Sequence, residues 1–134
     1  MISTDIAQWY DFNGKSAIVT GGTGVLGSAV AYALAACGAN VALLARTPQV
    51  PARFGNLDDA SAGRVIALAA DVLDKESLTA AAEKILEEFG RIDLLVNAAG
   101  GNHPDATATP DLSFFDLPAD ALKFVFDLNM LGTI

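Results

Sequence analysis

A cluster of glycines directly after a short apolar segment constrains the fold of this chain more than any other part of its sequence. Residues 16–20 form the apolar segment, and the glycines follow at the spacing Gly22-x-Gly24-x-x-Gly27. A buried strand that passes through a tight glycine turn into a helix is the first part of a β-α-β unit. A simple flexible turn between two core elements would use glycines in the same way. Residues further along the chain have to distinguish a binding loop from such a turn.

Four short apolar segments predict the strands of a parallel sheet. Their apolar residues are continuous rather than alternating, which is typical of strands that helices cover on both faces. The predicted strands are residues 16–20, 40–45, 64–70 and 92–97.

Helical patterns lie between these segments. Residues 27–37 are rich in small apolar side chains and precede Gly38, which suits the left-handed position after a helix. Residues 74–89 carry apolar side chains at helical spacing, with Asp74 as a candidate N-cap and Gly90 as the stop. A last helix is expected to contain Pro118 in its first turn and to run to the C-terminus.

The order of these elements predicts the fold class. Strands that alternate with helices over short connections favour right-handed crossovers and a doubly wound α/β sheet. Between the second and third strands, Pro48 and Pro51 argue against a long regular helix, and residues 56–62 could supply only a short one. With 134 residues, 52% of them hydrophobic, the chain predicts one domain, residues 1–134.

The charge of the chain limits its partners. The formal net charge is −8, so a nucleic-acid backbone or an anionic membrane would be repelled. No apolar run has the roughly 18 residues that a bilayer requires, and the N-terminus lacks a signal-peptide layout, so we expect a cytoplasmic protein. The pairs Asp71/Asp74 and Asp58/Asp59 offer too few oxygen ligands for a hard cation, and we expect no metal site.

The glycine spacing matches the fingerprint of dinucleotide-binding turns. Such a turn lets the backbone approach a pyrophosphate, and the following helix directs unpaired N–H groups at it. About twenty residues on, where an acidic residue would bind a ribose hydroxyl, the second strand is followed by Arg46. A guanidinium suits a 2′-phosphate, so Arg46 favours NADP(H) over NAD(H). The alternative is a solvated arginine that closes a strand.

Four motifs carry a resemblance to a known family. They are TGGTGVLG at residues 20–27, ADV at 70–72, NAAG at 97–100 and DLNMLGT at 127–133. In this order and spacing, the chain from about Phe12 onward resembles the short-chain dehydrogenase/reductase family. The resemblance implies a Rossmann-like doubly wound sheet and an NAD(P)-dependent oxidoreductase that reduces a carbonyl group by hydride transfer.

The resemblance also implies roles for individual residues. Asp71 and Val72 would border the adenine, residues 97–100 would line the nicotinamide side, and Asn129 would support a proton-relay water. Strand-end capping for Asp71 and Asn97 and a solvent-facing position for Asn129 are the plainer alternatives. With Arg46 added, the expected cofactor-binding residues are Gly21, Thr23, Gly24, Leu26, Gly27, Arg46, Asp71, Val72, Asn97, Ala98, Ala99 and Gly100.

The chain departs from the family pattern in two places. Val25 stands where the commonest pattern has glycine, so the turn also fits the spacing of the extended members. The active-site serine and the Tyr-x-x-x-Lys pair normally lie beyond the asparagine helix, and neither Tyr10 nor Tyr32 has a lysine four residues later. We therefore expect the cofactor-binding half of an enzyme, truncated after about four strands and the following helix, and inactive alone.

The loop after NAAG indicates a substrate class. Together with ADVLDKESL, it resembles the branch that contains D-mannonate oxidoreductase, or fructuronate reductase, which acts on a keto sugar acid. In that case Asn102 and His103 would hydrogen-bond a carboxylate or hydroxyl of the substrate, whereas an exposed loop histidine is the plainer alternative.

Two other kinds of protein remain compatible with the sequence. One is a non-catalytic NADP(H)-binding module that senses redox state or scaffolds a partner, and the other is a doubly wound domain that binds no nucleotide. For a full-length parent enzyme, the resemblance implies a homo-oligomer, a dimer or a tetramer. A sheet that ends at the fourth strand would leave that strand without a neighbour, so we expect the isolated chain to associate.

Overall fold

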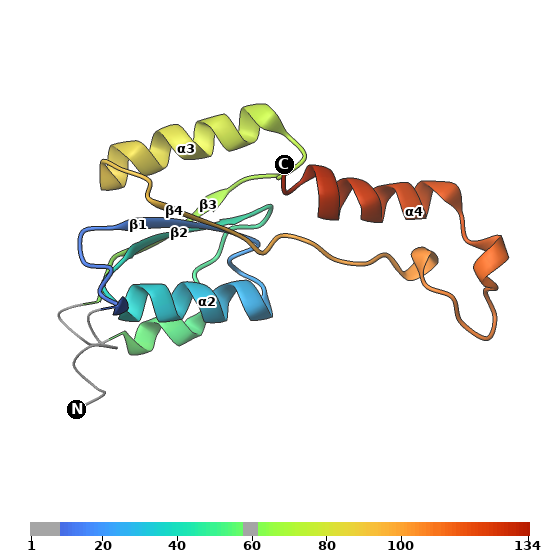
Figure 1. Ribbon diagram of the computed structural model, residues 1–134, viewed down its shortest axis with the longest axis horizontal. Coiled ribbons are helices and arrows are strands. Elements are labelled where there is room, and N and C mark those ends of the chain that lie inside the picture. The colour runs from blue at the N-terminus through green and yellow to red at the C-terminus, as the bar shows by residue number, and fades with distance from the viewer. Residues whose placement is uncertain (1–8, 58–61) are drawn as a thin grey trace.

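The predicted strands form one parallel sheet in the computed structural model, which describes residues 9–57 and 62–134. The strands are β1 (Ser16–Thr20), β2 (Asn40–Ala45), β3 (Val65–Ala69) and β4 (Leu94–Asn97). Their order across the sheet is β3-β2-β1-β4, with every pair parallel. The predicted Rossmann-like α/β fold is therefore confirmed (Figure 1).

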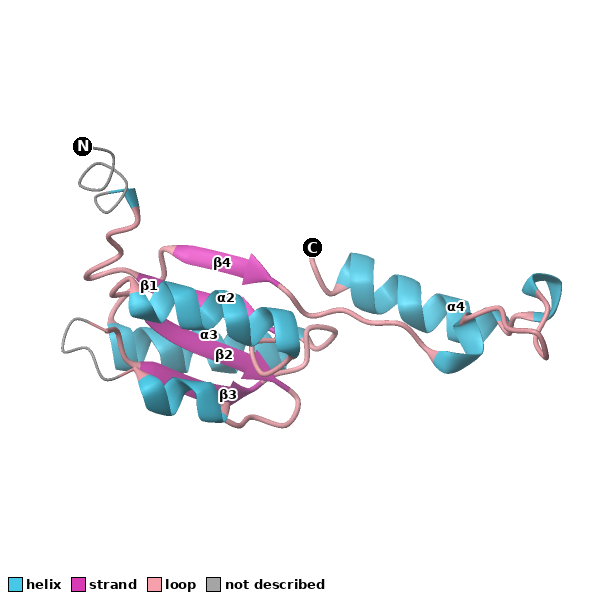
Figure 2. Ribbon diagram, turned by 90° about the horizontal axis from the view of Figure 1, so that it is seen from below, coloured by secondary structure: helices cyan, strands magenta, loops and turns pink. Residues whose placement is uncertain are grey.

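Helices cover the two faces of this sheet. Figures 1 and 2 show α2 on one face and α3 on the other. The helices are α2 (Val25–Ala36), α3 (Lys75–Phe89) and α4 (Ala119–Phe126), with 3₁₀ turns at Ala52–Asn56, Pro104–Ala106 and Phe114–Asp116. The turn Ala52–Asn56 is the only regular element described between β2 and β3, and residues 58–61 lie outside the described part of the chain.

The two central strands are buried because their alternate residues face different helices. Ala17 and Val19 of β1 pack toward α2, where Ala31 and Ala35 are fully buried. Ile18 of β1 belongs to the cluster on the opposite face, which packs against α3. Small side chains on α2 let the helix lie close to the sheet. The N-terminus of α2 directly follows the glycine turn, so it also lies close to the end of β1.

The prediction that all four strands are buried on both faces is wrong for the two edge strands. β3 is only partly buried, and β4 alternates between half-buried and exposed positions, with Leu95 59% exposed. Strand order decides this difference, because an edge strand has a neighbour on one side only.

Caps set the helix boundaries. The Asp74 carboxylate accepts hydrogen bonds from the N–H groups of Glu76 and Ser77, and Gly90 ends α3 with a φ of 76°. These features match the sequence predictions, as does the positive φ of Gly38. Pro118 is the N-cap of α4 rather than a residue of its first turn.

The last helix differs from the expected continuous helix. The α-helical part of α4 ends at Phe126 and passes into a π-helical turn, Asp127–Leu131. Figures 1 and 2 show α4 and the loop before it extending away from the sheet as an arm. Across the described residues, no helix has the length and apolar character needed to cross a membrane.

Asp93 joins β4 to β1 at the start of both strands. Its carboxylate accepts the Ser16 N–H at 2.8 Å, and its own N–H donates to the Ser16 carbonyl at 2.9 Å. Hydrogen bonds from the Arg91 guanidinium, and then from the Ser16 N–H, hold the pKa of Asp93 below its usual value. An aspartate with a lowered pKa stabilises the fold above its unfolded pKa, and this contribution is lost as the pH falls through its folded pKa.

We therefore expect Asp93→Asn to lower the urea midpoint near neutral pH. The difference from the unaltered chain should shrink as the pH falls through the folded pKa of Asp93. Urea unfolding at a series of pH values measures this, with exposed Glu83→Gln as the control. A difference that stayed constant with pH would contradict the assigned role of the carboxylate.

Candidate functional site

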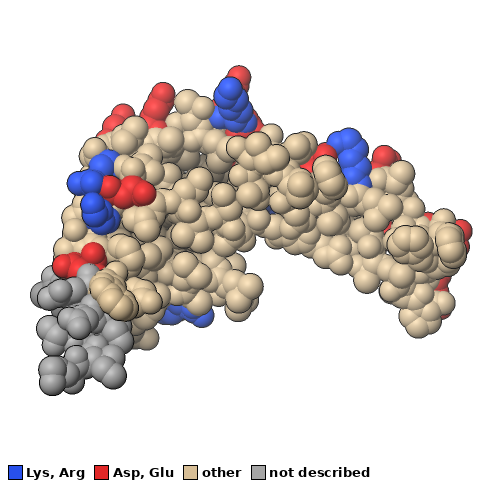
Figure 3. All heavy atoms as spheres, in the orientation of Figure 1, with Lys and Arg blue, Asp and Glu red and all other residues tan. Residues whose placement is uncertain are grey.

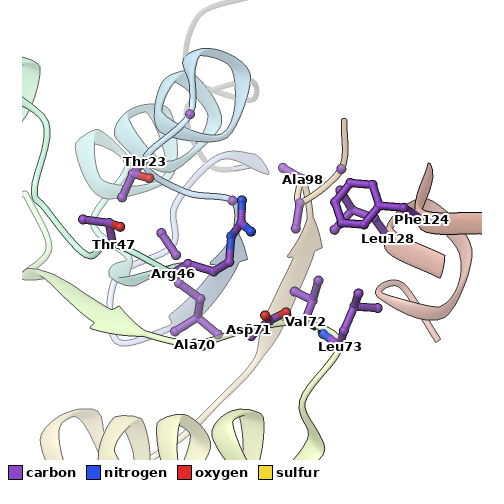
Figure 4. Close-up of a pocket in the computed structure, with 16 residues that line it drawn as sticks. Thr23, Arg46, Thr47, Ala70, Asp71, Val72, Leu73, Ala98, Phe124 and Leu128 are labelled. Atoms are coloured by element: carbon purple, nitrogen blue, oxygen red, sulfur yellow. Dashed lines mark hydrogen bonds between the residues drawn. The ribbon is translucent and has the colours of Figure 1, made fainter. Parts of the chain in front are cut away.

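A pocket of about 440 Å³ lies at the carboxyl ends of the four strands (Figure 4). In open parallel sheets this edge is where ligands bind. Loops that follow all four strands contribute to the pocket, and α4 closes one side. Its lining residues are Gly21, Thr23, Gly24, Leu44, Ala45, Arg46, Thr47, Ala70, Asp71, Val72, Leu73, Ala98, Ala99, Gly100, Phe124 and Leu128.

The glycine turn forms the wall nearest to α2. Gly21 has a φ of 64°, and a Cβ added there would lie 2.7 Å from the Ala98 carbonyl oxygen. A Cβ at Gly27 would collide with the Gly21 carbonyl, so helix and turn are packed backbone to backbone. The Ser28 N–H donates to the Gly24 carbonyl at 2.9 Å and closes the first helical turn. The N–H groups before it stand at the helix N-terminus, where an anion binds favourably.

Thr20 connects the glycine turn to the loop after β4. Its hydroxyl oxygen accepts hydrogen bonds from the N–H groups of Ala98 and Ala99, at 3.2 and 3.1 Å. This threonine sits at the end of a buried strand and joins the glycine turn to the neighbouring loop after β4, both of which line the pocket. Thr20 was not among the predicted site residues, although a hydroxyl at the end of a buried apolar strand is a signal for such a role.

Arg46 extends from the end of β2 into the pocket (Figure 4). Thr47 lines the pocket beside it, and the glycine turn lies on the same side. A guanidinium in this place can donate several hydrogen bonds to a phosphate. The adjacent Thr47 was not predicted, and its hydroxyl adds a further polar group to this part of the pocket.

Most of the expected cofactor-binding residues line this one pocket. They are Gly21, Thr23, Gly24, Arg46, Asp71, Val72, Ala98, Ala99 and Gly100. Leu26, Gly27 and Asn97 do not line it: the Leu26 side chain is 80% exposed, Gly27 is buried against the turn, and Asn97 pairs with Thr20 in the sheet. Phe124 and Leu128 do line it, although sequence reasoning did not select them. Their i, i+4 spacing on the last helix was the available signal.

Asn129 fixes the loop after β4 from the π-helical turn. Its side-chain oxygen accepts the Gly101 N–H at 3.1 Å, and its amide nitrogen donates to the Gly101 carbonyl at 2.8 Å and to the Val125 carbonyl at 2.7 Å. A Cβ at Gly100 would lie 2.6 Å from the Asn129 oxygen, so a larger residue there would displace the Asn129 side chain. The Asn129 side chain therefore positions the loop after β4, and its proton-relay role stays a prediction.

We expect Asn129→Ala to loosen this loop. The Gly101 N–H loses its acceptor, and its hydrogen exchange should become about fivefold faster, since a single hydrogen bond contributes about 1 kcal/mol. Exchange measured by NMR at Gly101 tests this. Asn102→Ala is the matched control, because the Asn102 amide donates only to the Thr107 hydroxyl among the described residues.

The expected substrate residues, Asn102 and His103, belong to the turn of residues 102–107 beside the pocket. We call it the braced turn because hydrogen bonds within it hold its shape. The Asn102 amide donates to the Thr107 hydroxyl at 2.7 Å, and His103 Nδ1 accepts the Asp105 N–H at 3.2 Å. The His103 ring packs edge-on against Phe124, with centroids 5.6 Å apart. Neither Asn102 nor His103 lines the pocket itself, and both lie next to a wall of it.

No tyrosine reaches the pocket. Tyr32 packs against Phe54 with ring centroids 5.8 Å apart, and Tyr10 is 58% exposed. Within residues 9–57 and 62–134, no three His, Cys, Asp or Glu side chains gather in a way that could hold a metal ion. The pair Asp58/Asp59 falls outside these residues.

The fold and the pocket define a parallel α/β domain with a glycine-rich turn at its ligand-binding edge. Comparison with known families identifies it further: the short chain dehydrogenase family matches residues 15–134. The chain belongs to this family of oxidoreductases. An uncharacterized oxidoreductase, UxuB, of Bacillus subtilis is 45% identical over 127 residues, which cover 89% of this chain and 46% of that protein.

Solved structures show the same relationship. A proposed D-mannonate oxidoreductase from Haemophilus influenzae, with bound NAD, has a TM-score of 0.80 and 36% identity over 95% of this chain and 49% of that one. The NADPH-dependent 3-quinuclidinone reductase of Rhodotorula rubra has a TM-score of 0.76 and 30% identity over 99% of this chain and 48% of that one. The chain thus spans about half the length of these three relatives.

Proposed function

We propose that the chain is the NADP(H)-binding part of a short-chain reductase. The observation that carries this proposal is the meeting of the glycine turn and Arg46 in one pocket. A volume of about 440 Å³ lies within the usual range for sites of small molecules. The relatives bind NAD in one case and depend on NADPH in another, so the preference for NADP(H) rests on Arg46.

The residues of the pocket fit the parts of a dinucleotide. The glycine turn and the N-terminus of α2 would hold the pyrophosphate, and Arg46 with Thr47 would hold the 2′-phosphate. Asp71 and Val72 would border the adenine, and the loop Ala98–Gly100 would line the nicotinamide side. The bound cofactor supplies the hydride of the reaction.

We propose a keto sugar acid, such as fructuronate, as the substrate that is reduced to a hydroxy acid such as D-mannonate. The name of the Haemophilus influenzae relative supports this class. In the braced turn, His103 Nδ1 accepts a hydrogen bond, so the neutral ring carries its proton on Nε2. The Nε2–H can donate to a hydroxyl or carboxylate oxygen of such a substrate, and the oxygen of the Asn102 amide can accept from a hydroxyl.

We propose that the acid that protonates the carbonyl oxygen lies outside residues 1–134. The proposal assigns it to a tyrosine in a Tyr-x-x-x-Lys pair of the parent protein, where a nearby cation lowers the phenol pKa. We therefore expect the 134-residue chain to bind cofactor and to show no turnover.

We propose that the parent forms a cytoplasmic homo-oligomer through α4. Leu122, Phe126 and Met130 recur along this segment and are 46%, 60% and 49% exposed. Figure 3 shows largely uncharged side chains over the face of the arm in view, with charged groups along its edge. An exposed apolar stripe of this kind is typical of an interface.

Kinetic assays of the parent protein test the proposed function. We expect fructuronate to be reduced with NADPH as the preferred donor, measured as NADPH oxidation, and no oxidation with the 134-residue chain alone. A parent that bound NADPH and reduced no carbonyl compound would favour the sensor or scaffold alternative instead. Steady NADPH oxidation by the 134-residue chain would contradict the proposed division of the site.

A further inference from the structure

The turn between β3 and α3 carries a hydrogen bond that reaches the wall of the pocket. Ser77, the third residue of α3, accepts the Asp71 N–H at its hydroxyl oxygen, at 3.1 Å. Ser77 itself does not line the pocket, whereas Asp71 does. The serine therefore acts on the pocket through another residue.

This bond gives an acceptor to a backbone N–H that the sheet leaves unpaired. The last bond of the β2–β3 ladder runs from the Ala70 N–H to the Ala45 carbonyl at 3.0 Å. N–H groups of successive strand residues point to opposite sides, so the Asp71 N–H, one residue after Ala70, points away from β2, and β3 is the edge strand of the described sheet on that side. A backbone N–H without a partner is costly, and Ser77 provides the acceptor.

Neighbouring bonds fix the positions of both partners. The Asp74 carboxylate caps α3 and accepts the Ser77 N–H at 3.3 Å, so the first turn of the helix is directed back at the strand end. The Asp71 carboxylate accepts the Leu73 N–H at 2.9 Å through Oδ1. Among the described residues, Asp71 Oδ2 accepts no hydrogen bond. It remains for a ligand in the pocket that Asp71 lines (Figure 4).

We infer that Ser77 is a positioning residue for the adenosine half of the cofactor. By holding the Asp71 backbone, it sets the direction in which the second carboxylate oxygen faces an adenine amino group, which is a hydrogen-bond donor. This role rests on the proposed nucleotide-binding function and adds a residue outside the pocket to it. Ser77 acts at the adenine, whereas Arg46 acts at the 2′-phosphate. The effects of the two residues can therefore be distinguished with one ligand that has a 2′-phosphate and one that lacks it.

Calorimetric titration of the 134-residue chain with ADP and with 2′,5′-ADP tests the inference. Ser77→Ala should raise the Kd of both ligands by the same factor, about threefold to tenfold, because one hydrogen bond is lost at a group that both ligands share. Ser77→Thr keeps the hydroxyl and should bind both ligands as the unaltered chain does. Thr79→Ala is the matched control, since the Thr79 hydroxyl donates within the same helix, to the Lys75 carbonyl at 2.9 Å.

The possible outcomes distinguish the positioning role of Ser77 from the proposed nucleotide-binding function. Unchanged binding in Ser77→Ala, or an equal weakening in Thr79→Ala, would overturn the positioning role and leave the proposed function standing. If the unaltered chain bound neither ligand, the proposed function would be wrong and the positioning role with it. Rescue by Ser77→Thr would show that the hydroxyl, rather than the stability of the helix, determines the affinity.

Discussion

Gly27→Ala is expected to abolish nucleotide binding and to destabilise the chain. The added Cβ would meet the Gly21 carbonyl oxygen and lie 2.9 Å from the Gly21 carbonyl carbon. These are backbone atoms of the turn that would hold the pyrophosphate, so they can move only if the turn changes shape. Overpacking of this kind costs about 1–3 kcal/mol of stability. Urea unfolding and NADPH titration measure the two effects.

Gly55→Ala is the matched control for this change. Among the described residues, nothing lies within 4 Å of a Cβ added at Gly55, so the free energy of unfolding should change by less than about 0.5 kcal/mol. NADPH affinity should stay as in the unaltered chain. Equal NADPH affinity in Gly27→Ala and the unaltered chain would show that the close approach of α2 to the glycine turn is unimportant for binding.

Arg46→Ala is expected to weaken 2′,5′-ADP binding by about 10- to 100-fold and to leave ADP binding unchanged. Hydrogen bonds to a charged group contribute about 1.5–3 kcal/mol, and only the ligand with a 2′-phosphate can form them with Arg46. Titration of both ligands measures the ratio of their affinities.

Arg53→Ala removes the same charge at an exposed position outside the pocket, and it should leave the ratio as it is. Equal losses for ADP and 2′,5′-ADP in Arg46→Ala would contradict its assignment to the 2′-phosphate.

Much of the fold could be predicted from the sequence because local rules determine it. Continuous apolar runs placed β1 and β2 at their observed residues, and the ends of β3 and β4 differ by one or two residues. The Asp74 cap and the positive φ of Gly38 and Gly90 follow from local backbone chemistry. The exposure of β3 and β4 was missed because it depends on the order of strands across the sheet, which no local pattern contains.

The candidate site also contains some residues that local sequence patterns reveal and others that only the folded chain brings together. The glycine turn and Arg46 are marked by their spacing from strand ends, so a sequence can reveal them. The bonds of Asn129 to Gly101 join residues 28 positions apart, and the π-helical turn that carries Asn129 departs from an ordinary helical pattern. Thr20 likewise acts on amides 78 and 79 residues away. Contacts over such separations emerge only once the chain is folded.

The central claim is that this domain binds NADP(H) in the pocket at the carboxyl edge of its sheet. Calorimetric titration of the 134-residue chain with NADPH and with NADH tests it most directly. We expect one NADPH per chain, bound more tightly than NADH, with the difference removed by Arg46→Ala. A folded chain that bound neither nucleotide would contradict the claim.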